Sequence, residues 1–244
     1  MTDNDLVETK KAGVASDNGG GVAAVDRALA IVAAVAASPD PCTLQQLAEA
    51  TTFYKSTILR LLGSLERAGY VIRLRQGSYA LGAMAFRLGA AYERSNPLRE
   101  IVLPVLRDLV EGGSESASFH VRQGNDKRIC LFRVDSHHST LDRIDAGDVL
   151  PLDRGAAGRI LLAFDGEKGP AFEALRHERF ALSMGEREPG CAGMAVPVFG
   201  AEGLLQGALS LSGPAERFTK SAIATWRPRL EASAAELTRV LGGR

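Results

Sequence analysis

Between Thr43 and Gly82 the sequence predicts two short helices followed by two strands, and this order leaves little freedom in how the segment can fold. It opens on Thr43-Leu44-Gln45-Gln46, which has the form of a capping box that satisfies free amides at a helix start. Apolar residues follow at helical spacing, stop near residues 50–52, and resume at i, i+3, i+4 and i+7 with Ile58, Leu61, Leu62 and Leu65. Two helices with about three or four residues between them are typical of a helix-turn-helix.

Two strands are expected after the second helix, which Gly69 should end. Residues 70–75 and 78–81 have strand-like composition and flank Gln76-Gly77, a turn in which glycine can adopt a positive φ. The whole segment therefore predicts a winged helix-turn-helix.

Positive charge is concentrated in this segment, although the chain as a whole has 29 basic and 29 acidic residues. At about 100° per residue, the face opposite the apolar stripe carries Ser56, Arg60, Gly63 and Arg67. Because phosphate contacts supply much of the affinity for DNA, we expect this face and the hairpin to bind a major groove. The predicted DNA-binding residues are Thr43, Tyr54, Lys55, Ser56, Thr57, Arg60, Arg67, Arg73 and Arg75. The alternative interpretation is the solvated side of a small helical domain.

The remaining sequence divides into four expected regions. Residues 1–20 lack apolar periodicity and a signal-peptide pattern, so we expect a disordered tail in a cytoplasmic protein. Residues 21–82 form the DNA-binding domain, whose first helix should pack through Val25, Leu29, Val32 and Ala36. Its longest apolar run, residues 28–37, is about half the length of a membrane span. Residues 83–95 predict a linker helix, and residues 96–244 a second domain.

The second domain is expected to have an α+β fold with antiparallel strands. A helix should begin after Asn96-Pro97, be kinked at Pro104 and end at Gly112-Gly113. Further helices are expected over residues 155–163, 173–176 and 219–241. Strands are expected over residues 116–121, 128–134, 140–143, 193–199 and 205–211.

The cysteines and histidines indicate neither a metal site nor a cofactor. Cys42, Cys130 and Cys191 share no Cys-x-x-Cys spacing, and adjacent His137 and His138 point in different directions on any regular element. A Cys/His hydrolase that uses Cys191 or Cys130 with His120 remains an alternative function. A third possibility is a winged helix that binds protein rather than DNA.

Three groups of residues resemble one known family. They are Ala24-Val25-Asp26-Arg27-Ala28-Leu29, Lys55-Ser56-Thr57-Ile58-Leu59-Arg60-Leu61-Leu62, and residues 194–199 together with 208–214. Over residues 22–241 the chain resembles IclR-family transcription regulators, although Thr52-Phe53-Tyr54 replaces their usual Gly-Leu-Pro. The resemblance implies a winged helix-turn-helix joined by a linker helix to a GAF-like effector-binding domain, in a homodimer or dimer of dimers. It also implies a repressor that binds double-stranded operator DNA under the control of a small molecule, with no catalytic activity.

The start of the helix at residues 155–163 predicts the ligand site. Gly155 to Gly158 offer free backbone N–H groups at the positive end of a helix dipole, which suits a carboxylate. Ser210 and Ser212 share one face of a strand, and Arg133 is able to bind a carboxylate with two hydrogen bonds. The predicted effector-binding residues are Arg133, Asp135, Gly155, Ala156, Gly158, Met194, Ser210 and Ser212, and the predicted effector is a small organic acid, with aromatic acids among the candidates. Each residue also has a structural interpretation: close packing for the glycines, backbone hydrogen bonds for the serines, and an ion pair for Arg133 with Asp135.

Overall fold

The computed structural model describes residues 21–140, 142 and 144–243 and divides into two compact units. The division falls between Ala90 and Ala91, and we call the two parts the N-terminal unit and the C-terminal unit. The tail expected over residues 1–20 lies outside the described residues.

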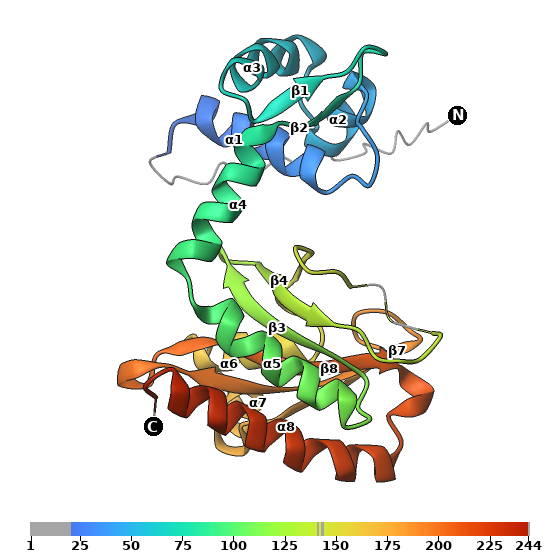
Figure 1. Ribbon diagram of the computed structural model, residues 1–244, viewed down its shortest axis with the longest axis vertical. Coiled ribbons are helices and arrows are strands. Elements are labelled where there is room, and N and C mark those ends of the chain that lie inside the picture. Colours follow the sequence, from blue (N-terminus) through green and yellow to red (C-terminus); the bar gives the residue numbers. More distant parts are fainter. Residues whose placement is uncertain (1–20, 141, 143, 244) are drawn as a thin grey trace, which may run out of the picture. The chain divides into compact units, whose positions relative to one another are not determined.

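Three helices and a hairpin make up the N-terminal unit (Figure 1). The helices are α1 (Ala23–Ala36), α2 (Leu44–Thr51) and α3 (Lys55–Arg67), and the antiparallel strands are β1 (Val71–Arg73) and β2 (Tyr79–Leu81). The expected capping box begins α2, since the Thr43 hydroxyl accepts from the Gln46 N–H at 3.2 Å and the Gln46 side chain accepts from the Thr43 N–H at 2.8 Å. A helix-turn-helix with a short wing is therefore present.

The core of this unit contains the expected residues of α3 but a different face of α1. Ile58, Leu62 and Leu65 are buried as expected. In α1 the buried residues are Ile31 and Val35, whereas Val25 and Leu29 are exposed, so the face expected for this helix was wrong. The reason is that the helix is Ala-rich and apolar on most sides, and its bulky β-branched residues, rather than the periodicity, decide which side fills the core.

The hairpin is shorter than expected, and a helix follows it. Residues 74–78 form the turn, with Gly77 at a φ of 87° and its N–H bonded to the Leu74 carbonyl at 2.9 Å. The helix expected next is α4 (Ala83–Ser95), and the division between the two units lies within it.

A six-stranded antiparallel sheet organises the C-terminal unit. In the sheet the order is β5-β4-β3-β8-β7-β6, made of β3 (Ser116–Gln123), β4 (Lys127–Val134), β5 (Val149–Pro151), β6 (Ala181–Met184), β7 (Cys191–Phe199) and β8 (Leu205–Pro214). The long neighbours β7 and β8 pair from Cys191 with Pro214 to Phe199 with Leu205. This arrangement confirms the α+β fold with antiparallel strands.

Helices cover both faces of this sheet (Figure 1). On one face lie α5 (Leu98–Glu111) and α8 (Lys220–Val240), whose apolar residues join Phe119, Val196 and Leu209 in the main core. On the other face lie α6 (Ala156–Phe164) and α7 (Pro170–Glu178), which pack on Ala195 and Ala208. Neighbouring residues of a strand point to opposite faces, so β7 and β8 serve both cores.

Three details of the C-terminal unit differ from the expectation or add to it. Thr140 and Asp142 lie in irregular structure rather than in the strand expected over residues 140–143, whose other two residues are outside the described part. The short strands β5 and β6 were not expected. Pro104 lies inside α5, and the Asn96 side chain accepts from the Leu98 N–H at 3.0 Å ahead of that helix.

Candidate functional site

The candidate DNA-binding surface is a set of five cations, Lys55, Arg60, Arg67, Arg73 and Arg75, which we call the cationic face. All five are exposed, because the buried side of α3 is taken by apolar residues and the hairpin projects its arginines from strand and turn positions. Among the described residues, no carboxylate lies within 4.0 Å of any of them. Their charge is thus available for an external anion.

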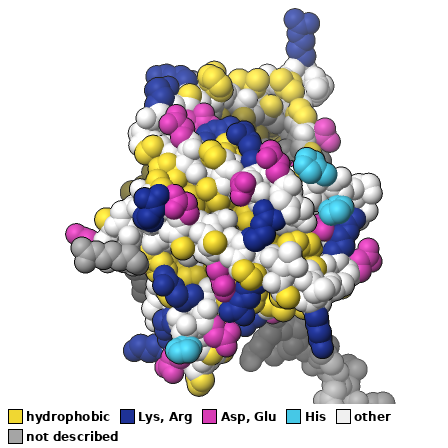
Figure 2. Space-filling model, turned by 60° about the horizontal axis from the view of Figure 1, so that its bottom comes forward, with side chains coloured by type: hydrophobic (Ala, Val, Ile, Leu, Met, Phe, Trp, Pro, Cys, Tyr) yellow, Lys and Arg dark blue, Asp and Glu magenta, His cyan; other side chains and the backbone are white. Residues whose placement is uncertain are grey.

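The other predicted DNA-binding residues surround the start of α3 or lie at the start of α2. Tyr54 caps α3 and is 86 % exposed, Ser56 and Thr43 are exposed, and Thr57 is partly buried. Arg67 donates to the Ser64 hydroxyl at 3.1 Å, and the Arg73 guanidinium lies 5.9 Å from the centre of the Tyr79 ring. By contrast, Figure 2 shows acidic and basic side chains interspersed over the face that it draws.

A small polar cavity in the C-terminal unit brings together five of the eight predicted effector-binding residues. Its walls include Gly155, Ala156, Met194, Ser210 and Ser212, and its volume is about 40 Å³. We call this space the polar cavity. It lies against the start of α6, on the α6 side of the sheet. The Met194 side chain itself is packed in the main core.

The remaining three predicted residues, Gly158, Arg133 and Asp135, stand behind the walls of the cavity. A Cβ at Gly158 would collide with the Leu152 carbonyl and lie 2.7 Å from Arg128 Nη1, so this glycine permits close packing. Arg133 donates to the carboxylates of Asp135 at 2.7 Å and Asp142 at 2.6 Å. It also reaches the Ser212 hydroxyl at 3.4 Å. Its guanidinium is therefore held by internal partners.

The N-terminus of α6 is partly satisfied by the chain itself. The Gly155 N–H donates to Glu186 at 3.2 Å, and Glu186 is also paired with Arg159 at 3.1 Å. Ala156 and Ala157, which belong to the first turn, have no acceptor for their N–H groups within the helix. Both residues line the polar cavity.

Two residues of the polar cavity that the sequence analysis did not connect with ligand binding are Arg128 and His120. Only 3 % of Arg128 and 2 % of His120 is exposed. Burial, and after it the charge of Arg187, lowers the pKa of Arg128 to about 10. Burial, together with the charges of Arg128, Arg133 and Arg187, holds the pKa of His120 well below its usual value. At neutral pH the cavity thus contains a charged guanidinium and a neutral imidazole.

A signal for both residues was present in the strand pattern. Arg128 and Cys130 are two apart in the expected strand 128–134, and His120 is two residues from Ser118, so each shares a face with a small buried residue. A charged side chain at an inward strand position is unusual in a core.

The cysteines do not have the properties of nucleophiles. Burial raises the pKa of Cys130 to about 11, and it also raises the pKa of Cys191. Since the thiolate is the reactive form, neither residue supports the Cys/His hydrolase alternative.

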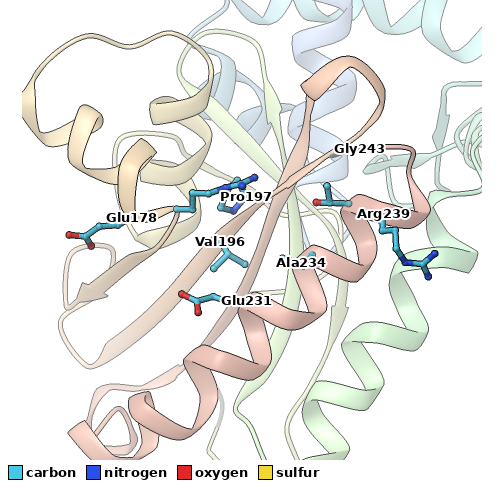
Figure 3. A pocket seen from close by; sticks show the side chains of 10 residues that line it. Glu178, Val196, Pro197, Glu231, Ala234, Arg239 and Gly243 are labelled. Carbon is cyan, nitrogen blue, oxygen red and sulfur yellow. The ribbon is translucent and has the colours of Figure 1, made fainter.

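A larger space, the apolar groove, lies on the α8 side of the sheet and has a volume of about 520 Å³. Its floor is formed by Val196 and Pro197 of β7 and Ala234 and Ala235 of α8, and Figure 3 shows the Arg239 side chain directed away from it. Two charged residues at its rim are already paired, Glu231 with Arg227 and Arg239 with Glu236. Although the groove is larger, the polar cavity is the better candidate for an organic acid, because its buried polar groups are able to recognise one.

None of the described helices is both long enough and apolar enough to cross a membrane.

Comparison with known proteins gives matches in both units. The family model of the IclR helix-turn-helix domain matches residues 24–75, and the model of the bacterial transcriptional regulator IclR C-terminal region matches residues 169–239. The HTH-type transcriptional regulator BhcR of Paracoccus denitrificans is 27 % identical over 252 residues, covering 93 % of this chain and 90 % of that protein. The transcriptional repressor IclR of Escherichia coli is 31 % identical over 146 residues, covering 59 % of this chain and 53 % of that protein.

A solved structure shares the fold. The crystal structure of an IclR homolog complexed with 4-hydroxybenzoate, from Microbacterium hydrocarbonoxydans, is 20 % identical with a TM-score of 0.68. The similarity covers 88 % of this chain and 99 % of that one.

Proposed function

The chain belongs to the IclR family of bacterial transcriptional regulators, and from this premise we propose that its cationic face binds an operator while an organic acid in the polar cavity alters that binding. In this proposal residues 21–82 are the DNA-binding domain, residues 83–95 the linker helix and residues 96–244 the effector-binding domain. The protein acts in the cytoplasm as a repressor, in agreement with the name of its Escherichia coli relative. It catalyses no reaction.

One observation supports DNA binding most directly: the five cations of the cationic face are exposed and make no ion pair with a described carboxylate. In a helix-turn-helix the second helix lies in the major groove, with its N-terminal residues at the base edges. Tyr54, Lys55, Ser56 and Thr57 are at that end of α3, and Arg60 is one turn further on. Thr43, Arg67, Arg73 and Arg75 are then placed to bind phosphates.

Two copies of the chain are required by the geometry of such a site. The half-sites of an operator that two recognition helices read are about 34 Å apart. We propose a homodimer, or a dimer of dimers, in which the effector changes the spacing of the two DNA-binding domains. A small change in that spacing alters the affinity.

The proposed effector site consists of the polar cavity and its supporting residues. Gly155, Ala156, Ser210 and Ser212 face the ligand, and Met194 contributes to the wall. Gly158, Arg133 and Asp135 hold the walls in place through the contacts described above. The 4-hydroxybenzoate bound to a relative of similar fold supports an organic acid as the class of effector.

The test of DNA binding is a salt titration with Arg60→Ala. We expect this change to weaken binding to the protein's own upstream region at least tenfold, because it removes a charge from the centre of the cationic face. If Arg60 contacts one phosphate, the slope of log affinity against log salt should fall by about 0.9. Fluorescence anisotropy with a labelled duplex measures both quantities.

The control is Arg107→Ala, which removes an exposed charge of the same size from α5. Its DNA affinity should equal that of the parent protein. Equal affinity of the parent and Arg60→Ala would contradict the proposed surface, and equal affinity of the parent for random duplex would contradict DNA regulation. Binding to the upstream fragment that does not depend on salt would favour a protein-binding role for the winged helix.

A further inference from the structure

Two buried polar atoms of the polar cavity have no hydrogen-bond partner among the described residues. They are Nε of Arg128 in β4 and Nδ1 of His120 in β3. A buried donor or acceptor left without a partner destabilises a protein by about 1–3 kcal/mol, and more if it is charged. Such atoms at the wall of a cavity therefore indicate a bound group.

Arg128 differs from the other arginines of this region because it has no carboxylate partner. Arg133 and Arg187 share the buried carboxylate of Asp142, whereas Arg128 donates Nη1 to the backbone carbonyls of Pro151 and Arg154. No described carboxylate lies within 4.0 Å of the Arg128 guanidinium. Buried charges are normally paired, so this corner of the cavity lacks one negative charge.

The N-terminus of α6 adds to the positive potential at the same place. A Cβ built on Gly155 would lie 3.5 Å from Arg128 Nη2, which puts the guanidinium against the first turn of the helix. The positive end of the helix dipole and the guanidinium repel each other and both attract an anion. Glu186 reaches only the Gly155 N–H in this turn.

The volume of the cavity limits the size of the anion. One water molecule needs about 10–15 Å³ on this measure, so the 40 Å³ of the cavity holds about three water-sized groups. A benzene ring exceeds this space. The ligand that fits is an aliphatic acid of a few carbon atoms.

We infer that Arg128 and His120 form a two-point receptor for a compact aliphatic acid that carries a hydroxyl or keto oxygen beside its carboxylate. Arg128 Nε donates to the carboxylate, and His120 Nδ1 bonds to the second oxygen. A hydroxyl matches either tautomer of a neutral imidazole, because it both donates and accepts. This inference rests on the proposed function, since it specifies the chemistry of the proposed effector site.

Four probes test the receptor on the full-length chain by thermal shift and calorimetry: lactate, propionate, lactamide and 4-hydroxybenzoate. Lactate should bind at least tenfold more tightly than propionate, which lacks the second oxygen. Lactamide, which lacks the charge, and 4-hydroxybenzoate, which is too large, should not bind at the same concentrations. Binding of none of the four, equal binding of lactamide and lactate, or tighter binding of 4-hydroxybenzoate overturns the inference.

Variants separate the two points of contact. Arg128→Gln should weaken lactate and propionate alike at least tenfold, whereas Arg128→Lys should recover part of the loss because it restores the charge. The matched control is Arg122→Gln, whose residue is directly opposite Arg128 in the β3–β4 pairing and is bonded to Asp165. It should bind lactate as the parent does. His120→Phe should reduce lactate binding to the level of propionate and leave propionate unchanged.

Operator binding measured in parallel distinguishes failure of this inference from failure of the proposed function. If organic acids alter operator affinity equally in the parent and in Arg128→Gln, the receptor is wrong and the regulator stands. If the parent shows no preference for its upstream DNA, the proposed function fails, whatever the acids do.

Discussion

His120 is a side chain that the fold keeps uncharged. Burial and the neighbouring Arg128, Arg133 and Arg187 lower its pKa, whereas in the unfolded chain it takes up a proton near pH 6.5. Below that pH the unfolded chain binds more protons at this position than the folded one. The free energy of unfolding therefore decreases as the pH falls below 6.5.

We expect His120→Asn to make unfolding less dependent on pH. Between about pH 7.5 and about pH 5.5 the parent should lose stability, with a His120 contribution that approaches about 1.4 kcal/mol per pH unit. Urea unfolding of the full-length chain at several pH values measures the slope. His137→Asn, which changes an exposed histidine, should retain the slope of the parent, and a His120→Asn protein that also retained it would show that His120 titrates normally.

At this scale the sequence predicts the residues whose signals are local. Gly155 and Ala156 are recognised from a helix start, and Ser210 and Ser212 from strand alternation. Which arginine lacks a counter-ion is not local, because it depends on where Asp142 folds between two distant segments. For that reason Arg133 was expected to be free for a ligand, whereas Arg128 is the arginine without a carboxylate.

Among the elements, α2 is the one whose stability depends most clearly on one side chain. The Thr43 hydroxyl accepts the Gln46 N–H at the helix start, and Thr43 is exposed, so its contribution is capping rather than packing. Thr43→Ala should lower the free energy of unfolding of the DNA-free protein by about 1 kcal/mol.

Chemical denaturation followed by far-UV circular dichroism measures this difference. Thr43→Ser, which keeps the hydroxyl, should stay within a few tenths of a kcal/mol of the parent. Indistinguishable Ala and Ser variants would mean that the capping box does not stabilise the helix.

Element by element, length decides what the sequence reveals. The helices and the long strands have enough residues to show their periodicity, whereas β5 and β6, with three and four residues, do not. A bulge also changes the pattern: between Phe119 and His120 the pairing of β3 with β4 shifts register. Arg128 and Arg133, five residues apart and so expected on opposite faces, consequently both face the α6 side of the sheet.

At the scale of the whole molecule, DNA binding and ligand binding are assigned to different units, so that each is open to separate mutation. The sequence predicts this division from one local cluster of positive charge in a chain of zero net charge. It also predicts α4 as the connection. It does not predict how a ligand changes the operator affinity, because that depends on the assembly of two copies.

The chain passes from one unit to the other inside the regular helix α4. Each helical residue turns the chain by about 100° and advances it by about 1.5 Å. One alanine inserted between Ala90 and Ala91 should therefore abolish the response of operator affinity to an effective acid while acid binding persists. Seven inserted alanines, about two turns, should restore part of the response, as measured by anisotropy with and without the acid. A full response after a single insertion would show that the helix does not transmit the signal.

A helical connector therefore conserves angular phase, which a flexible tether does not. Torsion produced at one end of such a shaft arrives at the other for as long as its backbone hydrogen bonds remain intact. In evolution, insertions and deletions in this stretch should accordingly come in whole turns.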